Sequence, residues 1–134
     1  AGMDENTPEG AEQAFRYYIA TLLWSRQTGN TEDLQKLYSG RCTQCANLSS
    51  EIEGHAKSGE LWRDVTVQDA GTGTFESTNY ELEVGYAFVI SEHLAPGALH
   101  PTPAHEWTGV GGMTWSSDGW EIEELALEET GNGT

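Results

Sequence analysis

The sequence predicts an α+β domain in which N-terminal helices pack in the concave face of a curved four-stranded antiparallel sheet, forming a cone. Before Gly59, apolar residues recur at three- and four-residue spacing, as in amphipathic helices. After Gly59 they alternate with polar residues, as in strands with one buried face. The length of 134 residues suits one such domain with one core.

The clearest element is a helix that begins at Pro8. Thr7 is a suitable N-cap, Pro8 fits the first helical position, and Gly29 is expected to end the helix. A shorter helix is expected from Thr31, and a third over residues 42–58. The apolar stripe of the first helix consists of Ala11, Ala14, Phe15, Tyr18, Ile19, Leu22 and Leu23.

Four strands are expected to follow, the first of them around Trp62, Val65 and Val67. The others are predicted over residues 80–90, over 107–115, and after a hairpin turn at Asp118-Gly119.

The sequence also predicts irregular positions within the strands and the boundaries of the domain. Gly85 predicts a bend or a close approach within the second strand, and the adjacent acids Glu123 and Glu124 predict a bulge in the last. Residues 95–104 are expected to form a loop. The single domain is assigned to residues 8–129, between a flexible tether (1–7) and a frayed tail (130–134).

The charge is strongly acidic. With 22 Asp and Glu against 6 Lys and Arg, the net charge is -16, which disfavours binding to nucleic acids and to anionic membranes. The acids are expected to keep a surface domain soluble, the alternatives being a cationic partner or bound calcium. No EF-hand loop of the D-x-D-x-D-G type is present, and no apolar run is long enough to span a membrane.

Cys42-x-x-Cys45 is the most specific local motif, and three readings compete. A redox pair would open a helix, as this pair does, but the βαβ pattern of thioredoxin-like proteins is missing. A zinc site would need two further ligands, and only His55 lies near in sequence. We favour a structural disulfide that fixes the first turn of the third helix.

Catalytic candidates are few. His93, His100 and His105 flank the proline-containing loop, but their spacing fits no zinc motif, so no metal site and no cofactor are expected. Four tyrosines are expected to point inward, and no carboxylate lies on the apolar face of the 80–90 strand. These tyrosines are Tyr18, Tyr38, Tyr80 and Tyr86.

Residues 8–18, 28–37 and 113–122 resemble the nuclear transport factor 2-like, or SnoaL-like, cone fold. Together with residues 42–45, the first two segments also resemble an uncharacterised family of actinobacterial surface lipoproteins. The resemblance implies a pocket at the mouth of the cone. We expect a ligand there to be bound by Tyr18, Leu22, Tyr86, Phe88, Trp107 and Trp115.

The function expected from these observations is a non-catalytic cell-envelope domain that binds a small apolar ligand or a protein partner in the cone pocket. One alternative is an enzyme of the isomerase or dehydratase kind. Another is a structural or dimerisation module, pairing as a homodimer through Val89 and the 107–115 strand. The resemblance implies an extracellular location with a lipid anchor upstream of residue 1.

Overall fold

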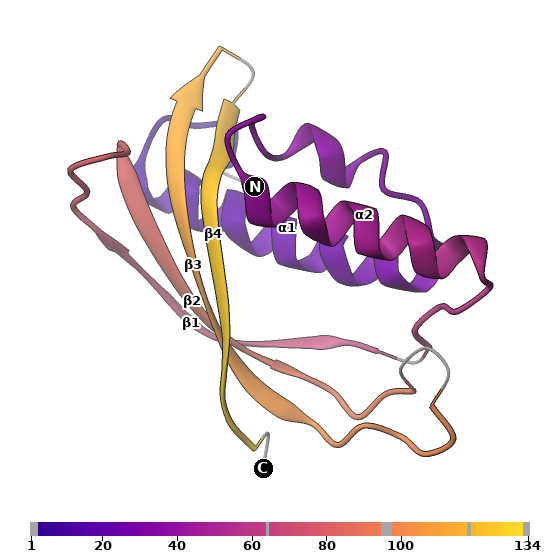
Figure 1. Ribbon diagram of the computed structural model, residues 1–134. Helices are drawn as coiled ribbons and strands as arrows, with labels where there is room; N and C mark the ends of the chain where they lie inside the picture. The colour runs from indigo at the N-terminus through magenta and orange to yellow at the C-terminus, as the bar shows by residue number, and fades with distance from the viewer. Residues whose placement is uncertain (1–2, 64, 95–97, 118, 133–134) are drawn as a thin grey trace.

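The computed structural model describes residues 3–63, 65–94, 98–117 and 119–132. Four strands form one antiparallel sheet in chain order, and both helices cover the same face of it (Figure 1). The predicted fold class is therefore confirmed. The elements are α1 (Pro8–Thr28), the 3-10 helix η1 (Leu34–Lys36), α2 (Thr43–Lys57), β1 (Val67–Phe75), β2 (Leu82–Ile90), β3 (His105–Ser116) and β4 (Gly119–Asn132).

Both ends of α1 follow the predicted signals. The hydroxyl of Thr7 accepts a hydrogen bond from the Gly10 amide at 2.9 Å, and Pro8 occupies the first helical position, as predicted. Gly29 ends the helix at a φ of 79°, a left-handed conformation that favours glycine. These local signals fix where the apolar stripe of α1 meets the sheet.

The remaining helices differ from the prediction mainly in length. The helix expected from Thr31 is the single turn η1. The third predicted helix is α2, whose N-cap is Cys42. Leu37 and Ser39, which follow η1, exchange backbone hydrogen bonds with Ile122 at the start of β4. The chain between the two helices is thereby fixed to an edge of the sheet.

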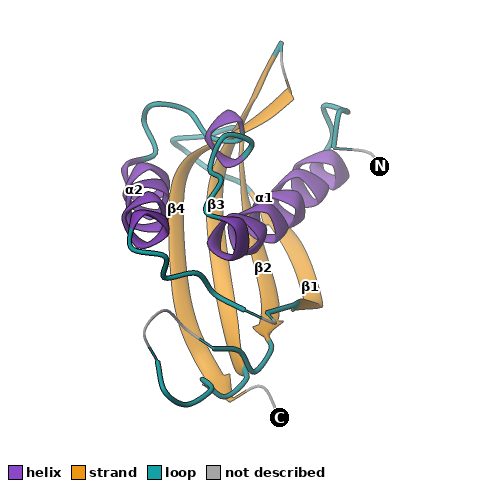
Figure 2. Cartoon of the chain, turned by 90° about the vertical axis from the view of Figure 1, so that its right-hand side faces the viewer, coloured by secondary structure: helices purple, strands orange, loops and turns teal. Residues whose placement is uncertain are grey.

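Two strand boundaries differ from the prediction. β1 begins at Val67, so Trp62 and Val65 precede the strand instead of forming it. The segment that carries them crosses the inner face of the sheet below the helices (Figure 2). β4 continues to Asn132, which pairs with His105, where a frayed tail was expected. Asp118 of the predicted turn and residues 95–97 of the predicted loop lie outside the described residues.

Both predicted irregularities are present. The register between β3 and β4 shifts where Gly112 pairs with Glu124 and the next residue pairs with Ile122, so Glu123 is the extra residue of a bulge. Gly85 allows a close approach, because a Cβ there would lie 3.2 Å from the ring of Phe75.

The core is built around Phe15, which is fully buried under the helix. A Cβ at Gly111 would lie 2.7 Å from Cε1 of this ring, and one at Gly109 would lie 3.2 Å from Cζ. The glycines of β3 therefore let α1 approach the sheet closely.

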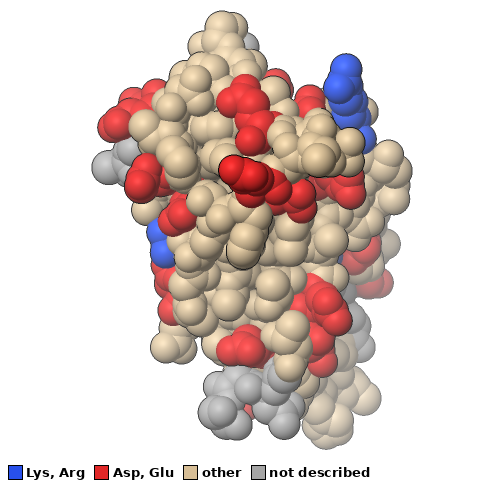
Figure 3. All heavy atoms as spheres, turned by 90° about the vertical axis from the view of Figure 1, so that its left-hand side faces the viewer, with Lys and Arg blue, Asp and Glu red and all other residues tan. Residues whose placement is uncertain are grey.

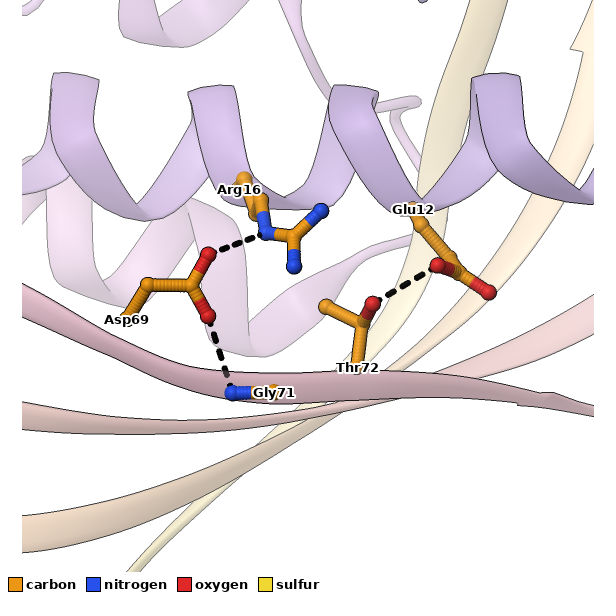
Figure 4. Close-up of polar contacts among 5 residues, drawn as sticks. All are labelled: Glu12, Arg16, Asp69, Gly71 and Thr72. Carbon is orange, nitrogen blue, oxygen red and sulfur yellow. Dashed lines mark hydrogen bonds and ion pairs between the residues drawn. The ribbon is translucent and has the colours of Figure 1, made fainter.

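Polar contacts fasten α1 to the edge strand β1 (Figure 4). Arg16 Nε lies 2.7 Å from Asp69 Oδ2, and the other carboxylate oxygen accepts from the Gly71 amide at 2.8 Å. One turn earlier, Glu12 accepts a hydrogen bond from the Thr72 hydroxyl at 2.7 Å. The contacts span the irregularity in β1 between Asp69 and Thr72, so they hold the helix against an otherwise irregular strand.

None of the helices among the described residues lies on the outer face of the sheet (Figure 1). Figure 3 shows this face, with uncharged atoms in the middle and groups of acidic side chains above and below. Strand alternation and the observed register place the acids Glu83, Glu106, Glu121, Glu124 and Glu128 on it. We call the apolar group between them the outer patch, which consists of Phe75, Ala87, Val89, Val110 and Ala126.

Candidate functional site

An aromatic cleft lies between the helices and the inner face of the sheet. Trp62, in the segment between α2 and β1, forms one wall, and Trp107 of β3 forms the other. The amide of Trp62 donates to the Arg26 carbonyl near the end of α1 at 3.0 Å, and this bond fixes the crossing segment.

Two neighbouring hollows make up this cleft, and they share Trp62, Ile90 and Trp107. The inner one has a volume of about 70 Å³, and the outer one about 200 Å³. The inner hollow is also lined by Ile19, Leu22, Leu23, Arg26, Leu48, Phe88 and Leu127. The outer hollow adds His93, Thr102, Pro103, His105 and Glu129.

Stacking interactions hold Trp62 in position. The Arg26 guanidinium lies 4.7 Å from the centroid of the Trp62 ring, and His93 stacks on the same indole at a centroid distance of 4.4 Å. Arg26 also pairs with Glu51 of α2 at 3.1 Å. The Trp62 indole thus connects the end of α1, through Arg26, to the segment after β2, through His93. Both contacts hold this wall of the cleft in place.

The mouth of the cleft is polar. His93 Nδ1 lies 2.7 Å from the Ser91 carbonyl, which can only accept, so this nitrogen carries the proton and Nε2 is the acceptor in a neutral ring. Across the mouth, His105 Nδ1 lies 3.4 Å from Glu129. Backbone bonds between His93 and Thr102 brace the loop that carries these groups. An apolar interior with a few polar groups at the entrance is typical of ligand-binding sites.

The structure brings three of the six predicted ligand-binding residues together. Leu22, Phe88 and Trp107 line the inner hollow. Tyr18 and Tyr86 are buried beside Phe15 in the core, outside this cleft. Trp115 packs edge-on against Trp120 near the far end of the sheet, at a ring distance of 5.6 Å. Whether any of the six binds a ligand stays a prediction.

The tyrosines expected to point inward divide into two groups. Tyr18 and Tyr86 are buried, and burial raises the pKa of both phenols. Tyr38 is half-buried, with its hydroxyl 2.8 Å from Ser49 Oγ. Tyr80 was wrongly expected to point inward, because it lies over Gly112 on the outer face and donates to Glu124. That hydrogen bond raises the pKa of the Tyr80 phenol.

A catalytic acid–base set would need a buried carboxylate or histidine converging with a tyrosine. In the part of the chain that the structure describes, no Asp or Glu is buried, and the buried titratable side chains are Tyr18, Tyr86 and His93. Tyr86 lies near Arg16, whose guanidinium is 5.8 Å from the ring centroid. His93 lies at the cleft and contacts Trp62, so the two groups are parts of different sites.

Cys42 and Cys45 are joined by a disulfide, as the sequence predicts. Both residues are buried, and Cys42 Sγ also accepts a hydrogen bond from the Cys45 amide at 3.2 Å. The bond therefore closes the first turn of α2 from inside the core. His55 lies far along the same helix, and the described residues contain no group of His, Cys, Asp or Glu that could hold a metal ion.

Sequence reasoning missed several residues of the cleft, above all Trp62, Ile90 and His93. Trp62 was assigned to a strand, and His93 was placed beside the proline-containing loop. The one available signal was the aromatic residue three positions after the helix-ending Gly59, because a tryptophan so close to a helix end favours a position against apolar surface beside it.

Two solved structures show the same fold. The intermembrane space region of the chloroplast protein ARC6 has a TM-score of 0.66 at 14% identity, covering 92% of this chain and 98% of that one. A domain of unknown function with a cystatin-like fold from Nostoc punctiforme has a TM-score of 0.63 at 14% identity, covering 92% and 80%. The protein is thus of the class of α+β domains whose helices cover one face of an antiparallel sheet.

Residues 1–101 match the Family of unknown function (DUF6318), and the chain belongs to this family. No curated protein matches it in sequence. The resemblance to the nuclear transport factor 2-like fold and to actinobacterial lipoproteins stays a prediction. Within the described ranges, none of the helices has the length and apolar character needed to cross a membrane.

Proposed function

We propose that this domain is a non-catalytic binding module of the cell envelope that takes one small apolar group into the aromatic cleft. The observation that carries the proposal is the cleft itself, with two tryptophan walls and an apolar floor. Only its mouth carries histidine and carboxylate side chains.

The volume of the cleft limits the ligand. The outer hollow of about 200 Å³ is comparable to the engineered cavity of roughly 150 Å³ that binds benzene. The inner hollow of about 70 Å³ adds little to it. The site therefore fits one ring or a short branched chain, and a sterol or an acyl chain is too large. Such a group is either a free small molecule or one side chain of a partner protein.

The envelope location rests on the disulfide. Disulfides persist in oxidising compartments and are rare in the cytosol, so an oxidised Cys42–Cys45 pair supports a place outside the cytoplasmic membrane. A lipid anchor upstream of residue 1 belongs to the same proposal and rests on the resemblance to surface lipoproteins.

The test measures the binding of indole and of benzyl alcohol by saturation-transfer NMR. We expect both to bind the wild-type domain, and Thr102→Phe to abolish binding because the larger side chain fills the outer hollow that Thr102 lines. Leu99→Phe is the matched control, since Leu99 is 92% exposed and lines neither hollow. Equal binding to the two variants, or no binding to the wild type, would contradict the proposal.

A further inference from the structure

A second site lies on the uncovered side of α1. Tyr17 and Trp24 are 44% and 43% exposed, although the opposite face of the same helix forms the core. They are seven residues apart, two helical turns, and so lie on one face. A shallow groove of about 390 Å³ runs beside them, lined by Tyr17, Ala20, Thr21, Trp24 and Asp33.

The chemistry of this groove is that of a cation site. The faces of tryptophan and tyrosine rings attract ammonium and guanidinium groups, tryptophan most strongly. Asp33, the residue before η1, adds a carboxylate to the same wall. We propose that the groove binds a lysine or arginine side chain of a basic partner segment.

Charge complementarity favours this occupant over a second copy of the chain. The net charge of -16 gives one copy little to offer an acidic, aromatic groove on another. Lys36 lies 3.9 Å from Asp33, but both side chains are largely exposed. An exposed pair of this kind contributes little, so an incoming cation displaces Lys36 at small cost. The proposal does not depend on the aromatic cleft, which opens elsewhere on the domain.

The test uses the whole chain and an acetylated, amidated peptide of glycine and lysine, with a matched peptide carrying norleucine in place of lysine. Binding is followed by the indole and backbone NMR signals of the wild type, Trp24→Ala, Asp33→Asn and Phe75→Ala. Phe75 is the control, because it is 60% exposed on the outer face of the sheet. Trp24→Ala leaves the net charge unchanged and so separates a specific site from the general acidic field.

We expect the lysine peptide to shift signals of Tyr17 and Trp24. Trp24→Ala should weaken binding by a factor of about 2 to 30, the range of cation–π contacts. Asp33→Asn should weaken it as well, and Phe75→Ala should leave it unchanged. Equal binding of the norleucine peptide, equal affinity of Trp24→Ala and Phe75→Ala, or no binding of the lysine peptide would overturn the proposal. Unchanged melting temperatures of these surface variants establish that they are folded.

Discussion

At the scale of single residues, the close approach of α1 to the sheet depends on what β3 lacks. The ring of Phe15 occupies the space into which side chains at positions 109 and 111 would project. It fits there because both positions are glycine. Such a pairing is invisible in the spacing of either segment, because it joins positions almost a hundred residues apart. It makes β3 the strand least tolerant of added atoms.

Gly111→Ala tests this pairing. The new methyl would meet Cε1 of Phe15 at 2.7 Å, so we expect a loss of about 1–3 kcal/mol in the free energy of unfolding. Gly54→Ala is the matched control, because it lies in α2 with open space around it and should stabilise the protein by about 0.5–1 kcal/mol. Urea denaturation measures both, and equal effects of the two changes would contradict the packing described.

The raised pKa values of two buried tyrosines predict that the protein loses stability at alkaline pH. Burial raises the folded-state pKa of Tyr18 and Tyr86 above the value of about 10 expected in the unfolded chain. Their contribution is therefore complete below about pH 10 and is lost as the pH rises through the folded-state values. We expect the urea midpoint to fall between pH 9 and 11.

Tyr18→Phe separates this effect from general alkaline damage. Among the described residues, the buried Tyr18 hydroxyl has no hydrogen-bond partner, so its removal should cost little at pH 7. The variant should lose less stability than the wild type between pH 9 and 11. An identical pH dependence would show that Tyr18 does not set the alkaline limit.

At the scale of elements, a single residue, Cys42, provides both the N-cap of α2 and one half of the disulfide. Cys42 caps the helix through its sulfur and is bonded to the residue one turn later. We expect dithiothreitol under native conditions to leave the bond intact, because both cysteines are buried. Rapid reduction, measured by thiol labelling and mass spectrometry, would instead revive the redox reading of the motif.

Breaking the crosslink by mutation measures its contribution. Cys42→Ser retains a side chain that can cap the helix, so the double change with Cys45→Ser removes mainly the covalent loop. We expect about 2 kcal/mol of lost unfolding free energy, as chain entropy gives for so short a loop. Cys45→Ser alone tests the same value, with the capping residue unchanged, and a loss of 5 kcal/mol would require another cause.

The elements predicted best are those with local signals. Thr7, Pro8 and Gly29 act within one helical turn of the ends of α1, so their effect can be deduced without the rest of the chain. β1 was misplaced because its middle, Ala-Gly-Thr-Gly-Thr, does not alternate. It is a strand because β2 pairs with it and α1 is fastened to it through Arg16 and Asp69.

The aromatic cleft was only partly predictable for the same reason. Phe88 and Trp107 lie on strands whose alternation shows their inward direction, and they pair with each other across β2 and β3. Trp62 and His93 come from irregular segments. They are brought together by a stack of rings and by isolated backbone bridges, which leave no periodic trace in the sequence.

At the scale of the whole molecule, the outer face of the sheet has the apolar outer patch at its centre and acidic side chains at its margin (Figure 3). Two copies meeting face to face would bring their glutamates together, so charge opposes the homodimer that the sequence suggests. We expect a monomer at low ionic strength and increasing association as salt screens the acids, since the Debye length falls to roughly 3 Å at 1 M.

Sedimentation velocity at 10 mM and 1 M sodium chloride measures this dependence. Phe75→Ser should abolish the association at high salt, because Phe75 is the largest exposed ring of the outer patch. Trp24→Ala, on the opposite side of the domain, should leave it unchanged. A dimer that is stronger at low salt would point to paired charges and contradict the outer patch as the interface.

The unpaired edge of β4 affects how the protein behaves at high concentration. Beyond Ile122, β4 has no neighbouring strand on its outer side among the described residues, so its backbone is open to templating by another unfolded chain. Two bulges interrupt that edge, and glutamates recur along it. Both features disfavour the flat, in-register stacking of amyloid. The glutamates of β4 thus also protect this edge from aggregation, and replacing them with valine should promote fibril formation.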